Sequence, residues 1–479
     1  MTILDRDLAS IQEVRTLVKQ AKIAQTKLVG LSQTALDDAV EGISKIAYEN
    51  AEALAKLANQ ETGFGKWEDK KAKNVLASKT LWQYMKDMKT VGVIHEDHER
   101  KVYQIATPMG VIAGLIPSTN PTSTVIYKSL IALKAGNSIV FSPHPSALKC
   151  ISETVRVLRE ACYLNGLPED LINCISMPTM EATDALMKHD DISMILATGG
   201  SAMVKAAYSS GTPALGVGPG NVPAYIERSA DIEDAVEKIF RSKGFDYGTV
   251  CASEQSIVTE KCIEQKVREA VVRNGGYFLR GEELEKVKRV MERPNGGMNP
   301  KIVGRSAHYI AEMAGITIPA HVKLLVSDEP GIGPKHPFSK EKLTQLLGFY
   351  VVENWHEACE TCFALLENGG LGHSLSIHSK DDAIIREFAM KKPVSRFLVN
   401  TPSTHGAVGL STGLAPSFTL GCGTVGGSAT GDNVTPLHLI NTRWMAYGLE
   451  ESKTTSASKL PNQDEIEMIC KMVLEQLNR

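Results

Sequence analysis

Apolar residues recur at spacings of three and four between about residues 8 and 86, as in LDDAVEGISKIAYENAEALAKLANQET. This period puts one apolar stripe along each segment, so it predicts consecutive amphipathic helices. From residue 92 the pattern changes to β-branched runs, VGVIHEDHERKVYQIATPMGVIAGLIP, and strand-like pieces such as SIVFSP then alternate with helical ones such as TSTVIYKSLIALKAG. Such alternation is typical of a parallel sheet covered by helices, and the sequence therefore predicts an α/β fold.

The alternation of strand-like and helical pieces starts again after Asp231. A helical piece, DIEDAVEKIFRSKGF, is followed by a turn around Cys251, by the strand-like SIVTE and by further pieces of both kinds as far as about Asn400. We therefore expect a second α/β lobe. Glycine and serine then crowd TPSTHGAVGLSTGLAPSFTLGCGTVGGSATGDN, which keeps enough apolar residues to indicate ordered loops near a site.

The C-terminal end of the chain has a different pattern. The polar stretch EESKTTSASKLPNQ has the composition of a linker, and DEIEMICKMVLEQLNR has the spacing of an amphipathic helix. The apolar positions of this helix are Ile466, Ile469, Cys470, Val473, Leu474 and Leu477. We expect a tethered amphipathic helix beyond the folded part of the chain.

Composition narrows the class of partner. The 479 residues are 43% hydrophobic and 22% charged, enough for a large core divided into two or three lobes. A formal net charge of −3 without a long basic run argues against nucleic-acid and membrane-surface partners, so a small-molecule substrate is expected. No stretch approaches the roughly 18 consecutive apolar residues of a membrane span, and MTILDRDLASIQEV has no apolar targeting segment, so a cytoplasmic location is expected.

Of the nine cysteines, Cys251 is the best candidate for a catalytic residue. The nine cysteines are scattered along the chain, and in a reducing compartment we expect free thiols and no metal site. In GFDYGTVCASEQS, small residues around Cys251 leave room for a substrate, and a helix N-terminus nearby would supply a positive field. On this local pattern alone, a nucleophile and a core thiol are about equally good interpretations.

Polar residues at other predicted strand ends could act together with this cysteine. GLIPSTNP places Asn120 just after a strand, where its amide and the backbone N–H of Cys251 could form an oxyanion hole, although Asn before Pro is also a common turn signal. SPHPS closes another strand. ATGGSAMVKAA has a glycine pair and a serine at a strand-to-helix turn, a position that suits phosphate groups but that many loops share.

Taken together and in order, these pieces resemble the aldehyde dehydrogenase superfamily, most closely its CoA-acylating branch, which includes the N-terminal half of bifunctional aldehyde/alcohol dehydrogenases. The resemblance runs from about residue 8 to 449 and rests on PSTNP, PHPSA, ATGG, GVGPGNVPAYI, GTVCASEQS, PFSKEKL, GLGHS, RFLVNTP and PSFTLGCGTVGG. It implies a Rossmann-type cofactor lobe, an α/β catalytic lobe and a small β-hairpin oligomerisation lobe. The expected ranges are 1–230 for the cofactor lobe with oligomerisation strands at about 92–108, 231–430 for the catalytic lobe, 431–450 for a returning strand, and 451–479 for the linker and helix.

The resemblance also implies a mechanism. Cys251 is then the nucleophile that attacks an aldehyde carbon, Asn120 holds the oxyanion of the thiohemiacetal, and hydride transfer to NAD or NADP leaves a thioester on the cysteine. His373 in GLGHS matches the acylating branch, with a structural loop histidine as the alternative. Glu341 in SKEKL resembles the glutamate that contacts the nicotinamide ribose, although by its local pattern it would be an exposed helix charge. The implied cofactor-binding residues are Ser142, His144, Thr198, Gly199, Gly200, Ser201 and Glu341.

One sequence position indicates whether water or a thiol accepts the acyl group. Hydrolytic members of the superfamily carry a glutamate in the segment ELGG that activates water, and the stretch GVGPGNVP here puts Val217 at that position. Without this base we expect the thioester to persist until the thiol of coenzyme A arrives, which makes a short-chain acyl-CoA. Glu254 is a weaker candidate for a substitute base, and a hydrolytic or phosphate-dependent enzyme is the alternative. Gln345 stands where the family usually has proline, a difference that affects the loop carrying Glu341 and leaves its contact with the ribose open. PHP takes the place of a cofactor-lobe lysine, so NAD and NADP both stay open.

Two further expectations concern assembly. The resemblance implies a homodimer or a dimer of dimers, built through the β-rich stretches VGVIHEDHERKVYQIATP and VTPLHLINTRWMAYG. The tethered helix resembles the encapsulation peptides of enzymes housed in bacterial microcompartments, so residues 464–479 are expected to bind shell or core proteins. A helix that packs on its own oligomer is the alternative.

Overall fold

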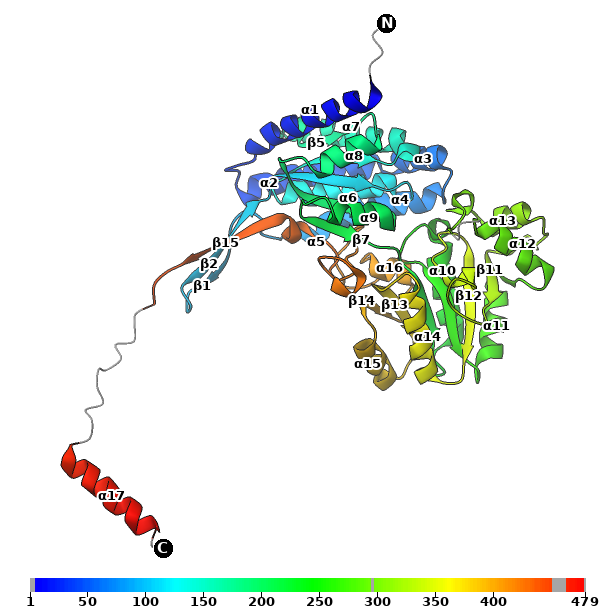
Figure 1. Cartoon of the computed structure of the whole chain (residues 1–479). Helices are drawn as coiled ribbons and strands as arrows, with labels where there is room; N and C mark the ends of the chain where they lie inside the picture. The colour runs from blue at the N-terminus through cyan, green and yellow to red at the C-terminus, as the bar shows by residue number, and fades with distance from the viewer. Residues whose placement is uncertain (1–4, 294–296, 450–461, 478–479) are drawn as a thin grey trace.

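The computed structural model describes residues 5–293, 297–449 and 462–477. Helices come first, as the period of the N-terminal segment predicts (Figure 1). They are α1 (Arg6–Thr26), α2 (Gln33–Glu49), α3 (Ala51–Thr62), α4 (Trp67–Val75) and α5 (Leu81–Met85), with a π-helical turn, Leu76–Thr80, between the last two. α1, α2 and α3 bury their apolar stripes; Val14, Val18 and Ala21 of α1, for example, pack in one cluster with residues of the first sheet. α4 instead buries Lys70, Lys73 and Asn74.

The first sheet is parallel and has five strands in the order β5-β4-β3-β6-β7. Its strands are β3 (Val111–Ile116), β4 (Ser138–Pro143), β5 (Ile172–Cys174), β6 (Ile192–Thr198) and β7 (Ala214–Val217). The connecting helices are α6 (Pro121–Lys134), α7 (Leu148–Leu164), α8 (Met180–Met187) and α9 (Ser201–Tyr208). The chain starts at the central β3, moves outward to β5 and then returns to the other side, so strand order reverses between β3 and β6. Open α/β sheets bind ligands at such a point, beyond the carboxyl ends of the strands.

The second sheet is also parallel and has seven strands in the order β10-β11-β12-β9-β8-β13-β14. Its strands are β8 (Val222–Ile226), β9 (Glu254–Glu260), β10 (Gly276–Phe278), β11 (Leu324–Asp328), β12 (Leu346–Val352), β13 (Gly372–His378) and β14 (Val394–Val399). The helices of this lobe are α10 (Ile232–Gly244), α11 (Glu264–Arg273), α12 (Glu282–Met291), α13 (Ala307–Ala314), α14 (Trp355–Glu367), α15 (Asp382–Lys391) and α16 (Ser403–Ala407). The predicted α/β architecture with two parallel sheets is confirmed.

The pairing of β8 moves the expected boundary between the two lobes. A boundary at residue 230 assigns β8 to the first lobe, whereas β8 pairs with β9 and β13 in the seven-stranded sheet. Residues 218–221 therefore carry the chain from one sheet to the other. The run VPAYI is buried throughout, as are the central strands of the first sheet, so its pattern gave no sign of the crossover.

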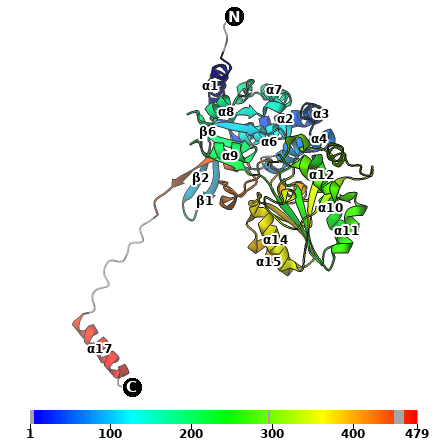
Figure 2. The ribbon, with the colours of Figure 1, turned by 45° about the vertical axis from the view of Figure 1, so that its right-hand side comes forward.

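A three-stranded antiparallel sheet projects from the first lobe (Figure 2). Its strands are β1 (Gly92–Asp97), β2 (Val102–Pro108) and β15 (Ile440–Ala446), with β2 in the middle. The hairpin and the returning strand thus meet as the two β-rich stretches predict. Trp444 and Tyr447 at the end of β15 are exposed by 62% and 57%, which leaves large apolar side chains on this sheet without cover.

The glycine- and serine-rich segment 401–433 is ordered and joins the two lobes. Phe418, Leu420 and Val434 belong to the same buried cluster as α6, and the hydroxyl of Tyr127 on α6 donates to the carbonyl of Val434 at 2.6 Å. Ser428 Oγ donates to the carbonyl of Gly216 in β7 at 2.8 Å. The expectation of ordered loops is therefore confirmed.

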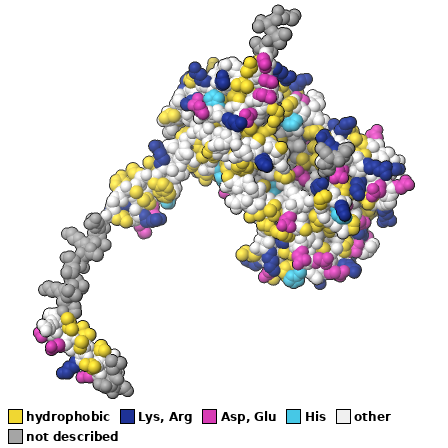
Figure 3. Space-filling view, in the orientation of Figure 1, with side chains coloured by type: hydrophobic (Ala, Val, Ile, Leu, Met, Phe, Trp, Pro, Cys, Tyr) yellow, Lys and Arg dark blue, Asp and Glu magenta, His cyan; other side chains and the backbone are white. Residues whose placement is uncertain are grey.

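α17 (Gln463–Leu477) stands apart from the rest of the described chain (Figures 1 and 2). Its apolar side chains are in solvent: Ile466, Ile469 and Val473 are 48–51% exposed, and hydrophobic side chains are visible along the helix in Figure 3. The predicted linker falls mostly on residues 450–461, and this part, like the side chain of Leu477, lies outside the described residues. In the ranges that the structure describes, no helix has both the length and the apolar character needed to cross a membrane.

Candidate active site

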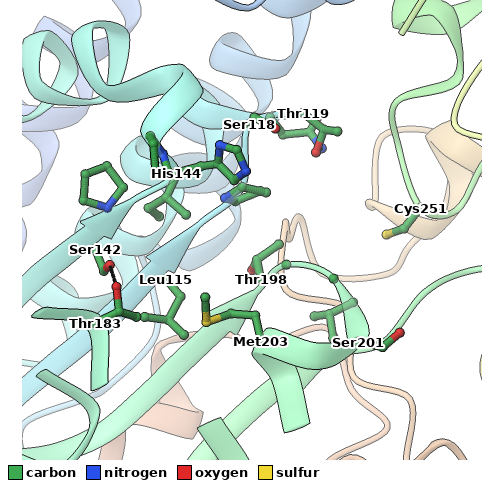
Figure 4. A pocket seen from close by; sticks show the side chains of 18 of the residues that line it. Leu115, Ser118, Thr119, Ser142, His144, Thr183, Thr198, Ser201, Met203 and Cys251 are labelled. Carbon is green, nitrogen blue, oxygen red and sulfur yellow. Dashed lines mark hydrogen bonds between the residues drawn. The ribbon is translucent and has the colours of Figure 1, made fainter. Parts of the chain in front are cut away.

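A cavity of about 430 Å³ opens where the carboxyl ends of the first sheet meet the Cys251 turn of the second lobe. One wall is made by residues that follow β3, β4 and β6, and the other by residues around Cys251 and Glu341. Figure 4 shows Cys251 across the cavity from Ser142 and Thr183, with its sulfur pointing toward the open space. Strands from two separate sheets thus bring together motifs that are distant in the sequence.

Cys251 lies in a turn between a 3₁₀ segment, Phe245–Gly248, and β9. Its side chain is partly exposed to the cavity. Burial of the surrounding turn raises the pKa of the thiol to about 12, Glu341 and Cys422 add to the rise, and Arg396 opposes it. A strand follows the cysteine directly, so no helix starts at this turn; the helix start near Cys251 is that of α6, whose N-cap Asn120 lies at the same cavity. Among the charged side chains that act on the thiol, the carboxylate of Glu341 has the largest effect, so the expected positive field is not found.

Asn120 lies at the end of the loop after β3, in the N-cap position of α6. Its Nδ2 donates to the carbonyl of Thr249 at 3.3 Å and to the hydroxyl of Thr119 at 3.2 Å, and its Oδ1 accepts from Lys73 Nζ at 2.6 Å. The donor end of the amide therefore faces the turn that carries Cys251, and both residues line the cavity.

The residues implied for the cofactor also lie around this cavity. Ser142, His144, Thr198, Gly199, Gly200, Ser201 and Glu341 all line it. Burial lowers the pKa of His144, so its ring is neutral at neutral pH, and Nδ1 accepts from the amide of Ser146. Glu341 lies in a loop rather than on an exposed helix; its Oε1 accepts from the amide of Gly220 at 3.1 Å, and burial raises its pKa to about 7.

The glycine-rich turn suits the phosphates of a dinucleotide. Gly200 is the N-cap of α9 and offers no side chain, and a Cβ there would meet nothing within 4 Å, so the first amides of the helix are accessible from the cavity side. The buried Thr198 hydroxyl has no partner among the described residues. Free donors at a helix start and an unpaired hydroxyl match the oxygens of a phosphate, so the residues present fit the cofactor.

Two candidate bases, His373 and Glu254, lie outside the cavity lining. His373 is fully buried in β13 and does not line the cavity; burial and Arg396 hold its pKa well below its usual range. A Cβ on Gly220 would lie 3.4 Å from its Cε1 and 1.9 Å from the carbonyl oxygen of Cys251, so only a glycine separates the ring from the cysteine turn. Glu254 is buried in β9, bonded to the amide of Ser403 and away from the cavity.

Val217 ends β7 and lines the cavity, paired in register with Thr198. Of the described residues that line the cavity, Glu341 alone carries a carboxylate, and it is tied to Gly220. The cavity wall at the end of β7 is therefore apolar.

Sequence reasoning missed part of the wall. Pro178, Thr179, Met180 and Thr183 line the cavity, and Thr183 bonds to the Ser142 hydroxyl at 2.9 Å. The signal that could have found them is their place in the loop and first turns of α8 that follow β5, at the same sheet edge as the other loops. The remaining cysteines are free thiols, including Cys359 and Cys362, whose CxxC spacing falls inside α14.

A cavity of this kind, with a glycine-rich helix start on one sheet and a cysteine turn on the other, defines a dinucleotide-binding α/β protein with a thiol at its centre. The model of the "Aldehyde dehydrogenase family" matches residues 2–285. The chain belongs to this family.

Curated relatives agree with this assignment. The chain is 42% identical over 448 residues to the bifunctional aldehyde-alcohol dehydrogenase AdhE of Escherichia coli, with 92% of this chain and 50% of that protein covered. It thus spans about half the length of that relative. It is 38% identical over 448 residues to the succinate-semialdehyde dehydrogenase (acetylating) of Clostridium kluyveri, with 93% and 98% covered.

Solved structures show the same fold. A probable aldehyde dehydrogenase from Listeria monocytogenes is 56% identical, with a TM-score of 0.92 and 94% and 99% of the two chains covered. The propionaldehyde dehydrogenase of Rhodopseudomonas palustris, solved with bound CoA and an acylated cysteine, is 28% identical with a TM-score of 0.83, over 91% and 97%. A propionaldehyde dehydrogenase from a Clostridium phytofermentans microcompartment is 28% identical with a TM-score of 0.82, over 91% and 97%.

Proposed function

We propose that this chain is a CoA-acylating aldehyde dehydrogenase that interconverts a short-chain aldehyde and its acyl-CoA with NAD or NADP. The observation that carries the proposal is one cavity that holds the Cys251 thiol and the Asn120 amide but has Val217 at the position of the hydrolytic glutamate. The acetylating relative and the neighbour with CoA and an acylated cysteine support it. The direct test is incubation with C2 to C4 aldehydes, NAD and CoA, with acyl-CoA as the expected product.

Cys251 and Asn120 divide the first step between them. The Cys251 thiol gives up its proton to solvent and its sulfur adds to the aldehyde carbon, and the negative charge that develops on oxygen is stabilised by Nδ2 of Asn120 together with the backbone N–H of Cys251. NAD(P)⁺, when bound, supplies the acceptor for the hydride that leaves this carbon. Thr198, Gly199, Gly200 and Ser201 would hold its phosphates, and Ser142, His144 and Glu341 would complete the wall around it.

The thioester on Cys251 is then released by thiol exchange. The CoA sulfur attacks the thioester carbon, and the Cys251 thiolate leaves and takes up a proton. His373 is our candidate to assist this step: its Nε2 is buried without a partner among the described residues, and its ring lies directly behind Gly220. An unpaired buried nitrogen next to the cysteine turn suits a group that exchanges a proton when the acceptor is bound.

Replacing Val217 with glutamate is expected to raise the share of thioester that ends as free acid. The new carboxylate would lie at the cavity wall, where it could activate water. Val217→Gln is the matched control, because its amide has a similar length but is no base. The measurement is the ratio of free acid to acyl-CoA by chromatography; an unchanged ratio, or an equal rise in both variants, contradicts the role given to this position. Formation of acyl phosphate in phosphate buffer without CoA would favour the phosphate-dependent alternative.

We further propose a homodimer or a dimer of dimers that forms through the three-stranded sheet. The exposed Trp444, Met445 and Tyr447 on and after β15 support this, because large apolar side chains left exposed on a projecting sheet are typical of a surface that another subunit covers. The first sheet with residues 1–221 would then be the cofactor lobe and the second sheet the catalytic lobe.

We propose that α17 is an encapsulation peptide that places the enzyme inside a bacterial microcompartment. Its apolar face is exposed and contacts no other described element, and one structural neighbour comes from a microcompartment. A surface of this kind costs roughly 25 cal/mol per Å² in water, so a partner should cover it.

Removal of residues 453–479 is expected to leave kcat/KM and the oligomeric mass by light scattering nearly unchanged, because α17 contacts nothing that builds the cavity. Fusion of the same residues to a fluorescent protein should recruit it to microcompartment shells expressed in the same cell. Diffuse fluorescence beside intact shells, or a truncated enzyme that dissociates into inactive subunits, would instead identify the helix as an oligomer brace.

A further inference from the structure

A buried cluster of charges lies behind Asn120. Lys70 and Lys73, one turn apart on α4, are each 3% exposed, and both donate to Oδ2 of the fully buried Asp246, at 2.9 and 2.5 Å. Burial acts to raise the pKa of Asp246, but the two ammonium groups outweigh it and hold the pKa below its usual range. Such a cluster is weak evidence for stability, because apolar side chains of similar volume often stabilise a core as well or better. Its position next to the site therefore calls for another explanation.

Lys73 also bonds directly to the side chain of Asn120. Its Nζ donates to Asn120 Oδ1 at 2.6 Å and to Thr249 Oγ1 at 3.1 Å. An ammonium group can only donate, so it can bond the oxygen of the amide but not the nitrogen. Nδ2 must then face the opposite way, toward the carbonyl of Thr249, two residues before Cys251.

Asp246 in turn fixes the ammonium of Lys73. Its backbone has φ 46° and ψ 37°, a left-handed conformation that few residues other than glycine adopt. Its amide donates to Asp69 Oδ2 at 2.8 Å, and its Oδ1 accepts from the amide of Lys66 at 2.8 Å. Bonds on both sides of the residue therefore hold the carboxylate in place.

We propose that Lys73 is a positioning residue for the oxyanion hole: its ammonium, held by Asp246, fixes the orientation of the Asn120 amide so that Nδ2 faces the site of addition. The contact also polarises the amide and makes its N–H a stronger donor. Lys73 does not line the cavity, so its effect passes through Asn120. The inference rests on the proposed role of Asn120 in catalysis.

The test is a double-mutant cycle between Lys73→Met and Asn120→Ala, with kcat and KM as readouts. Lys73→Met is expected to lower kcat by about 10-fold or more, but by less than the 10²–10³ typical of a lost oxyanion donor, with KM nearly unchanged. In the Asn120→Ala background, Lys73→Met should have almost no further effect, because the group it positions is gone. Losses that multiply in the double variant would overturn the inference, since Lys73 would then act without Asn120.

Lys70→Met is the matched control. It removes the other cation from Asp246; Lys70 donates to the carbonyl of Thr119 at 3.3 Å but makes no bond to the Asn120 side chain. Lys70→Met should therefore lower the Tm about as much as Lys73→Met while kcat falls by far less. Equal losses of kcat in the two lysine variants would show that the cluster only supports the fold.

Should Lys73→Met fail to fold, Asp246→Asn serves in the same cycle, because asparagine tolerates the left-handed backbone. If kcat is unchanged in the Asn120→Ala single variant, both the proposed role of Asn120 and this inference are overturned. If Asn120→Ala loses kcat as expected but the losses of the two single variants multiply in the double variant, only the inference is overturned.

Discussion

Replacing Cys251 with alanine is expected to abolish both NAD reduction and acyl-CoA formation. No other described thiol lines the cavity, so no group remains there to form the thiohemiacetal or to carry the acyl group. The side chain is only partly buried and faces open space, so the free energy of unfolding should change by less than about 1 kcal/mol. The fold should survive while the chemistry is lost.

The measurement combines steady-state turnover with a thermal melt of the same preparation. Cys422→Ala is the matched control, because Cys422 is a buried thiol near the crossover between the two sheets that does not line the cavity. This control should keep turnover and lose some stability through a small packing defect. Turnover retained in Cys251→Ala, or lost in Cys422→Ala alone, would move the nucleophile assignment away from Cys251.

Much of the cavity could be predicted because its residues come from motifs at strand ends. The loops after β3, β4 and β6 carry PSTNP, PHPS and ATGG, and parallel strands bring their carboxyl ends to one edge. Family resemblance then connected these loops to the cysteine turn across the lobe boundary. The amphipathic spacing in turn predicted the N-terminal helices and α17, because one apolar stripe needs no knowledge of distant partners.

The charges and burial around Cys251 could not be predicted from the sequence. The raised pKa of Cys251 depends on burial and on Glu341, a residue from a distant loop, whereas the local pattern of small residues favoured a positive field. The crossover of the chain before β8 was hidden for a similar reason, since a strand that is buried on both faces fits either sheet.

The buried charge cluster behind Asn120 could not be predicted from the sequence either. Lys70 and Lys73 stand in the polar stretch WEDKKAKNV, where lysines normally cover a solvated helix face. Their partner Asp246 is more than 170 residues away in sequence. Only the packing of α4 against the turn before Cys251 turns this exposed-looking pattern into a buried ion cluster.

Asn120→Ala is expected to lower kcat by about 10²–10³, or about 2.7–4 kcal/mol of transition-state stabilisation, the usual scale for one oxyanion donor. The ground-state aldehyde carries little negative charge on oxygen, so KM should change far less than kcat. The measurement is the initial rate over a range of aldehyde concentrations with NAD and CoA saturating.

A second substitution separates this role from a merely structural one. Asn120→Asp keeps the shape, suits the N-cap position of α6 and can still bond to Lys73, but it replaces the donor by an acceptor at the point where negative charge develops. If Asn120 stabilises the oxyanion, aspartate should be at least as damaging as alanine, because a carboxylate would repel that charge. If the residue only shapes the turn before α6, aspartate should restore most of kcat. A loss confined to KM in the alanine variant would instead make Asn120 a substrate-binding residue, so the two variants together distinguish the three roles.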